Sequence, residues 1–188
     1  MDLVFLPATA PGDTTYGSVP KRVEGHPGAS ITQVRYPRLV WYNEAVRREA
    51  ITQIRALRCS QIVLVGFSKS GLGAWNIARA IPEMVAGTII FDAPVTQTDR
   101  HRWPTEAFYP DDASWQRDLP SRTVREFRDA MCETHRLVLI SGASFHNEMC
   151  ALSNMLTENG LEHIFLPRPG MKHHWNAGWI EEGLARMR

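Results

Sequence analysis

The chain has 188 residues, a length that suits one domain with a substantial hydrophobic core and no metal or disulfide to hold it together. Hydrophobic residues make up 44% of the chain and charged residues 22%, which is typical of a globular protein and excludes a disordered or fibrous one. The formal net charge of +1 gives no electrostatic reason to expect a nucleic acid or an anionic membrane as partner.

The cysteines and the amino terminus indicate the compartment. Three cysteines without CxxC spacing predict reduced thiols, not a disulfide framework or a zinc site. Residues 1–7 have no basic region, and their apolar run is too short for a signal peptide. No apolar run approaches the length that spans a membrane. We therefore expect a cytoplasmic protein.

Short apolar runs rich in β-branched residues alternate with segments of helical periodicity. The predicted strands are 3–6, 31–36, 61–65, 88–91, 136–140 and 163–166. The predicted helices are 40–57, 72–80, 121–134, 148–158 and 176–187. This alternation predicts a single α/β domain over residues 1–188, a three-layer α/β/α sandwich with a mostly parallel sheet of about six strands.

Residues 93–120 interrupt the pattern. Four prolines break the segment, and four aromatic residues accompany them: Trp103, Phe108, Tyr109 and Trp115. We predict an excursion over the carboxyl edge of the sheet that forms a cap or partial lid. The alternative is that the aromatic side chains only pack a connection onto the body of the domain.

The most informative stretch is VLVGFSKSGLG, residues 63–73, in which a buried strand runs into a turn of small residues and then a helix. It resembles the G-x-S-x-G nucleophile elbow of the α/β-hydrolase superfamily, with Ser68 at the apex and Ser70 in place of the second glycine. The resemblance implies that Ser68 is a nucleophile and that the fold is a minimal form without the usual first two strands.

The resemblance also implies an oxyanion hole. The backbone N–H of Lys69, at the start of the helix, would be one donor. By position, Ala8 or Thr9 in the loop after the first strand would supply the other. The Lys69 side chain has two alternatives: it leans towards the substrate and favours an acidic group, or it is solvated, which we expect.

The loop after the last predicted strand contains Gly170, followed by His173 and His174. It resembles the Gly-x-x-His loop of the same superfamily, which implies that His173 is the base, with His174 as the alternative. An imidazole suits this role because its ordinary pKa lies near neutrality, so that it takes the serine proton and returns it to the leaving group.

Two carboxylates compete for the third place in the triad. Phe145 stands at the position where the superfamily often has its acid, and Glu148 is the nearest carboxylate. Asp92 directly follows the predicted strand 88–91, which comes one strand before the strand 136–140 in the chain. Some members of the superfamily have their acid at this site. We favour Asp92 over Glu148.

These features predict a serine hydrolase that acts on a small ester or thioester through an acyl-enzyme, without a metal or another cofactor. The expected partner is a small-molecule substrate. Two other classes remain open: a catalytically inactive α/β-hydrolase-fold protein that binds or regulates, and a flavodoxin-like binding module in which the late histidine has no role.

Overall fold

The computed structural model describes residues 1–8, 19, 21–25, 30–34 and 41–187. Its strands are β1 (Asp2–Leu6), β2 (Ser30–Gln33), β3 (Ile62–Phe67), β4 (Val85–Phe91), β5 (Arg136–Ile140) and β6 (Ile164–Leu166). Its α-helices are α1 (Lys21–Glu24), α2 (Glu44–Ala56), α3 (Lys69–Ala80), α4 (Asp112–Asp118), α5 (Val124–Ala130), α6 (His146–Glu158) and α7 (Trp179–Ala185). Short 3₁₀ helices are η1 (Arg100–Arg102), η2 (Pro120–Arg122) and η3 (Trp175–Ala177).

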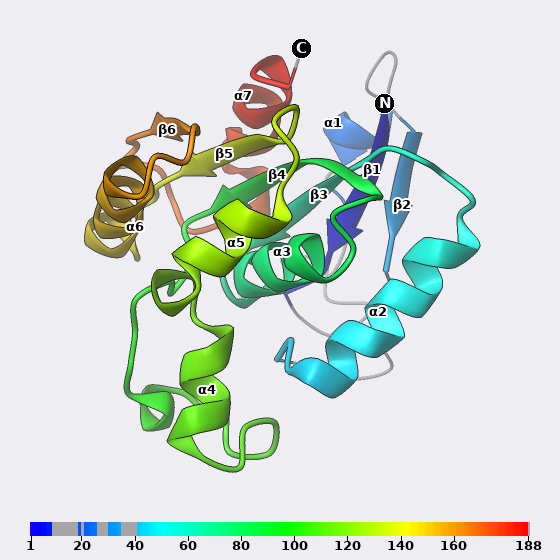
Figure 1. Ribbon diagram of the computed structural model, residues 1–188. Helices are drawn as coiled ribbons and strands as arrows, with labels where there is room; N and C mark the ends of the chain where they lie inside the picture. The colour runs from blue at the N-terminus through cyan, green and yellow to red at the C-terminus, as the bar shows by residue number, and fades with distance from the viewer. Residues whose placement is uncertain (9–18, 20, 26–29, 35–40, 188) are drawn as a thin grey trace.

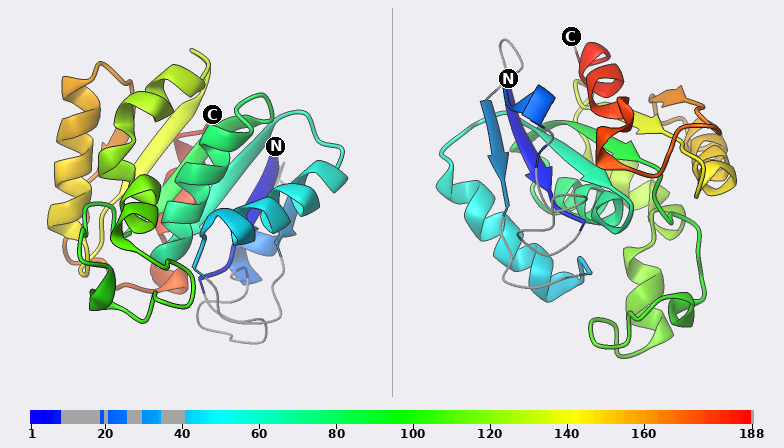
Figure 2. Two further views of the ribbon diagram at one scale, coloured as in Figure 1. Left: turned by 60° about the horizontal axis from the view of Figure 1, so that its bottom comes forward. Right: turned by 180° about the vertical axis from the view of Figure 1, so that it is seen from behind.

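The six strands form one sheet in the order β2-β1-β3-β4-β5-β6, and every neighbouring pair is parallel. Helices cover both faces, which confirms the predicted α/β/α sandwich of about six strands (Figures 1 and 2). The predicted sheet was mostly parallel, and the observed one is entirely so. The carboxyl ends of all six strands therefore meet at one edge.

Alternate residues of each strand face opposite layers of the core. On β3, Val63 and Val65 belong to the cluster that includes residues of α1 and α7, whereas Ile62 and Leu64 belong to the cluster beneath α2, α3, α5 and α6. Because both faces of the strand are buried, its sequence is continuously apolar and not alternating, as expected for a central parallel strand.

Several element boundaries differ from the sequence predictions, each for a local reason. The second strand is Ser30–Gln33, and the end of the predicted range, 35–36, lies outside the described residues. Helix α2 begins at Glu44 and not at residue 40, because the Asn43 side chain accepts a hydrogen bond from the Val46 N–H and caps it. The last predicted helix is divided into η3 and α7 by Gly178, whose φ is 97°.

The segment 93–120 contains η1 and α4 and is drawn at the bottom of Figure 1. Trp115 of α4 is completely buried, and its indole N–H donates to the Gln97 carbonyl. The segment is also bound to the start of α2, because the Asn43 amide donates to the Phe108 carbonyl oxygen at 2.7 Å. Its aromatic side chains thus anchor it to the body of the domain, and its role as a cap or lid stays a prediction.

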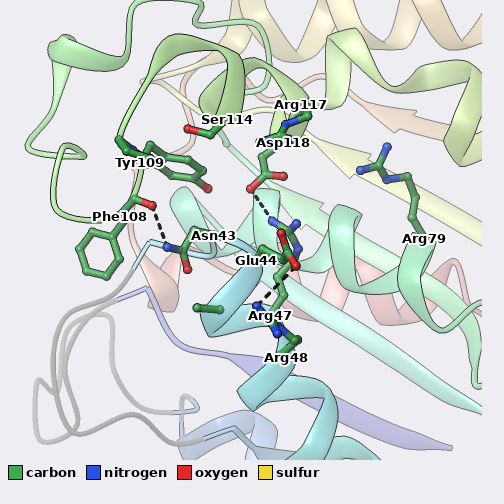
Figure 3. Close-up of a pocket in the computed structure, with 12 residues that line it drawn as sticks. Asn43, Glu44, Arg47, Arg48, Arg79, Phe108, Tyr109, Ser114, Arg117 and Asp118 are labelled. Atoms are coloured by element: carbon green, nitrogen blue, oxygen red, sulfur yellow. Dashed lines mark hydrogen bonds and ion pairs between the residues drawn. The ribbon is translucent and has the colours of Figure 1, made fainter.

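A nearly buried ion pair completes this attachment. The Arg47 guanidinium of α2 pairs with the Asp118 carboxylate of α4, and their side chains are only 14% and 8% exposed (Figure 3). Arg47 also donates to the Tyr42 carbonyl, while the Asp118 carbonyl accepts from the Asn76 amide of α3. No described helix is both long and apolar enough to cross a membrane.

The Arg47→Met variant tests this attachment. It should lower the free energy of unfolding by about 3–5 kcal/mol, because it leaves the Asp118 carboxylate buried without its partner. Combining it with Asp118→Leu should recover part of that loss, since neither charge of the pair then remains. Urea denaturation measures both effects.

Arg48→Met is the matched control. Arg48 is the next residue along α2, and its pair with Glu44 is 3.5 Å long with both side chains 75% exposed. Its loss should cost less than about 1 kcal/mol. Equal losses in the Arg47→Met and Arg48→Met variants would contradict the assigned role of the Arg47–Asp118 pair.

Candidate active site

Ser68 lies between β3 and α3 in a backbone conformation that non-glycine residues rarely adopt. Its φ is 54° and its ψ −130°. Such a conformation costs on the order of 1–3 kcal/mol and persists only where the surroundings enforce it. Here the Ser68 N–H donates to the Phe91 carbonyl of β4, and the Ser68 carbonyl accepts from the Gly71 N–H of α3. The strained turn is thus held from both sides, and the Ser68 residue is partly exposed.

Glycines on either side of Ser68 allow the strand and helix to approach closely. A Cβ at Gly66 would lie 2.9 Å from the Gly71 Cα, and a Cβ at Gly71 would lie 2.7 Å from the Ala93 Cβ. Both contacts are shorter than real Cβ atoms make. The turn therefore requires glycine at positions 66 and 71.

Ser70, the departure from the motif, has a structural role. Its side chain is completely buried, and its hydroxyl donates to the Phe67 carbonyl at 2.9 Å. The same oxygen accepts from the Phe67 N–H at 2.8 Å. The hydroxyl thus satisfies both backbone groups of the residue that precedes Ser68, which a glycine at position 70 would not do.

The predicted oxyanion donors are only partly described. Lys69 is the first residue of α3, where backbone N–H groups have no acceptor within the helix. Ala8 is buried two residues after β1, and Thr9 lies outside the described residues.

The Lys69 side chain differs from the expectation of a solvated lysine. It is partly buried, and its Nζ lies 5.6 Å from the centroid of the Trp41 ring. Burial lowers the pKa of Lys69 to about 8.

The structure joins His173 to Asp92. The Nδ1 of His173 lies 2.7 Å from Oδ2 of Asp92, whose side chain is completely buried. Three backbone N–H groups also donate to this carboxylate, those of Gly142, Ser144 and Phe145, at 2.8–3.1 Å. These donors compensate the burial of the carboxylate, and they orient it towards the imidazole.

The imidazole of His173 lies at the end of β3 as well as at the end of β4. Its ring centroid is 4.4 Å from that of Phe67, the residue before Ser68. In the sheet register Phe67 pairs with Phe91, so that Ser68 and Asp92 follow neighbouring strands at the same level. The structure thus gathers Ser68, Asp92 and His173 at one edge of the sheet.

The two alternative residues make other contacts. Glu148, in the first turn of α6, accepts hydrogen bonds from the N–H and the hydroxyl of Thr96, at 2.9 and 3.1 Å. It therefore fastens the start of the 93–120 segment to α6. The Nδ1 of His174 accepts from the Asn176 N–H and caps η3.

The amide donors to Asp92 were missed by sequence reasoning. They lie in the loop between β5 and α6, and Phe145, which stands where an acid was expected, contributes one of them. One signal was present: Gly142, where a Cβ would lie 2.5 Å from the Asp92 carboxylate carbon.

The described residues offer no metal site, and their hollow between α2 and α4 is separate from the three candidate residues. No group of three or more His, Cys, Asp or Glu side chains there is arranged to hold a metal ion. A hollow of about 440 Å³ lies between the start of α2 and α4 and includes Arg47, Arg79 and Asp118 in its lining (Figure 3). None of Ser68, Asp92 and His173 lines this hollow.

Comparison with known proteins identifies the architecture. No family model and no curated protein sequence matches the chain. Among solved structures, MPT51 (FbpC1) of Mycobacterium tuberculosis matches with a TM-score of 0.72 at 12% identity, over 100% of this chain and 90% of that one. An S-formylglutathione hydrolase from Agrobacterium tumefaciens gives a TM-score of 0.67 at 16% identity, with coverages of 100% and 84%.

Naproxen esterase from Bacillus subtilis gives a TM-score of 0.62 at 13% identity, over 98% of this chain and 82% of that one. At such identities the likeness concerns the fold, and sequence comparison alone does not detect it. The strand order, the turn at Ser68 and these structural neighbours together show that the chain has the α/β-hydrolase fold.

Proposed function

We propose that this protein is a serine hydrolase that cleaves an ester or thioester of a small substrate. Ser68 is the nucleophile, His173 the base and Asp92 the acid. The observation that carries the proposal is the hydrogen bond between Asp92 and His173, made beside the strained turn that presents Ser68. Two of the structural neighbours, the S-formylglutathione hydrolase and naproxen esterase, are hydrolases by name, which supports the same class of reaction.

The proposed reaction has two half-reactions. In the first, Ser68 Oγ forms a bond to the substrate carbonyl carbon while its proton passes to His173 Nε2. The carbonyl carbon then loses the alcohol or thiol, which takes the proton from His173. In the second, water gives a proton to His173 as its oxygen attacks the acyl carbon. The bond between that carbon and Ser68 Oγ then breaks, the acid leaves, and His173 returns the proton to Ser68 Oγ.

Asp92 and the backbone donors stabilise the charges that arise. The Asp92 carboxylate accepts the Nδ1–H of His173, which fixes the tautomer that leaves Nε2 as the base. The negative charge on the substrate oxygen would be met by the Lys69 N–H and by a donor from Ala8 or Thr9.

Two features favour the alternative of an inactive binding protein: Ser70 stands where the motif has its second glycine, and the sequence offers two carboxylates for the acid. Ser70 is compatible with the turn, because it bonds both backbone groups of Phe67. Asp92 is bound to the imidazole, whereas Glu148 is bound to Thr96. The hypothesis of an active hydrolase is therefore better supported than that of an inactive binding protein.

Covalent labelling tests the nucleophile and the base. The wild-type protein should react with a fluorophosphonate probe and hydrolyse p-nitrophenyl acetate, and Ser68→Ala should abolish labelling because no oxygen remains to attack phosphorus. His173→Ala should lower both rates by several orders of magnitude, since nothing then accepts the serine proton. Gel fluorescence and absorbance measure the two readouts.

His174→Asn is the matched control for His173→Ala, because asparagine retains the ability to cap η3. It should be labelled like the wild-type protein. A folded wild-type protein that neither reacts with the probe nor hydrolyses the ester would favour the binding-protein alternative.

The acid is tested by Asp92→Asn and Glu148→Gln. Asp92→Asn should lower kcat by about 10⁴-fold, because the amide no longer holds the productive imidazole tautomer. Glu148→Gln should lower kcat by less than about 10-fold, since Glu148 bonds Thr96 and not the histidine. Circular dichroism must show that both variants are folded, and the reverse order of effects would overturn the assignment of Asp92.

A further inference from the structure

A row of aromatic side chains connects the proposed base to Lys69. The Phe145 ring lies 5.5 Å from the His173 ring, and the Trp103 ring lies 5.9 Å from Phe145. Trp41 follows at 5.8 Å from Trp103, and the Lys69 ammonium lies over Trp41. We call Trp41, Trp103 and Phe145 the aromatic rim.

The contacts link the two chain neighbours of Ser68 to each other through His173 and the aromatic rim. Lys69 directly follows Ser68 in the chain, and Phe67, which precedes it, contacts the His173 ring. The rim then leads from His173 back to Lys69. The two chain neighbours of Ser68 thus contact the proposed base on one side and the first member of the aromatic rim on the other.

The Lys69 ammonium has no carboxylate partner among the described residues. Burial is the cause of its lowered pKa, which shows that its charge is less well solvated than that of a surface lysine. The ring of Trp41 compensates part of this cost, because the negative face of an aromatic ring attracts a cation placed over it. An anion supplied by a ligand would compensate the rest.

We propose that Lys69 Nζ binds a carboxylate of the substrate, so that the enzyme prefers esters that carry a second, ionised carboxyl group. Lys69 directly follows Ser68 and adjacent Cα atoms are about 3.8 Å apart, so that the Lys69 side chain and an ester bonded to Ser68 start from neighbouring points of the chain. One lysine supplies one positive charge, which matches a carboxylate better than a phosphate dianion. This inference rests on the proposed function and adds the substrate class to it.

Two matched pairs of esters test the preference, each pair differing in charge but not in size. For an anion in the acyl part, monoethyl glutarate is compared with ethyl 4-carbamoylbutanoate. For an anion in the alcohol part, acetoxyacetate is compared with acetoxyacetamide. Hydrolysis is followed by titration of the released acid, and kcat/KM for the anionic ester should exceed that for the neutral one by about 10-fold or more in at least one pair.

Lys69→Gln should reduce this kcat/KM ratio to within about 3-fold of unity, because the favourable charge is gone. The ratio is the diagnostic quantity, since any effect of the variant on the oxyanion hole acts on both esters and cancels. Lys172→Gln is the matched control: it removes an exposed lysine next to His173 and should leave the ratio at its wild-type value. A wild-type ratio near unity in both pairs, or a high ratio that Lys69→Gln leaves unchanged, would overturn the proposal.

The Ser68→Ala variant separates this inference from the proposed function. Its binding of monoethyl glutarate and of acetoxyacetate, measured by calorimetry, should be weakened about 10-fold or more by the addition of Lys69→Gln for at least one of the two. If binding to the Ser68→Ala variant depends on Lys69 but the wild-type protein hydrolyses no ester, the hydrolase is refuted and the carboxylate site is retained. The absence of any dependence on Lys69 would refute the site, whatever the hydrolysis.

The pH dependence gives an independent readout. A lysine whose pKa is about 8 is charged below that pH and neutral above it. The wild-type kcat/KM ratio for the preferred pair should therefore be high at pH 7 and fall as the pH rises through about 8, whereas the Lys69→Gln ratio should stay flat. A wild-type ratio that is constant from pH 7 to pH 9.5 would contradict the assignment to Lys69.

Discussion

The interaction on which the candidate site depends is the burial of the Asp92 carboxylate at the end of β4. A charge with no access to water needs donors, and Asp92 receives three from the backbone between Gly142 and Phe145 and one from His173. These bonds tie together loops that follow three different strands. The carboxylate thus determines how the β5–α6 loop is folded and where the histidine loop lies.

The second constraint is the close approach of β3 and α3 at Ser68. The strained backbone of Ser68 is held by hydrogen bonds to β4 and within α3, and glycine at positions 66 and 71 leaves room for it. Because these contacts come from the central strands and the most buried helix, the stability of the core maintains the strain. The proposed nucleophile is thereby presented by a rigid element.

The proposed substrate contacts near Ser68 involve several further elements of the fold. The aromatic rim takes one residue from the approach to α2, one from the 93–120 segment and one from the start of α6, and Lys69 lies against its first member. The 93–120 segment is fixed in turn by Trp115, by the Arg47–Asp118 pair and by the bond between Glu148 and Thr96. Substrate contacts proposed here are therefore coupled to the packing of the helical layer.

The sequence by itself determined the sandwich, the central position of β3, and Ser68 and His173 as the residues to examine. These conclusions rest on local patterns: apolar runs, helical periodicity and small residues around a turn are encoded within a few positions of one another. Only the tertiary structure decided between Asp92 and Glu148, gave Phe145 a backbone role and brought Lys69 onto Trp41. Those outcomes depend on the contacts between segments 28 to 81 residues apart, which parallel packing of the strands creates and which no local pattern contains.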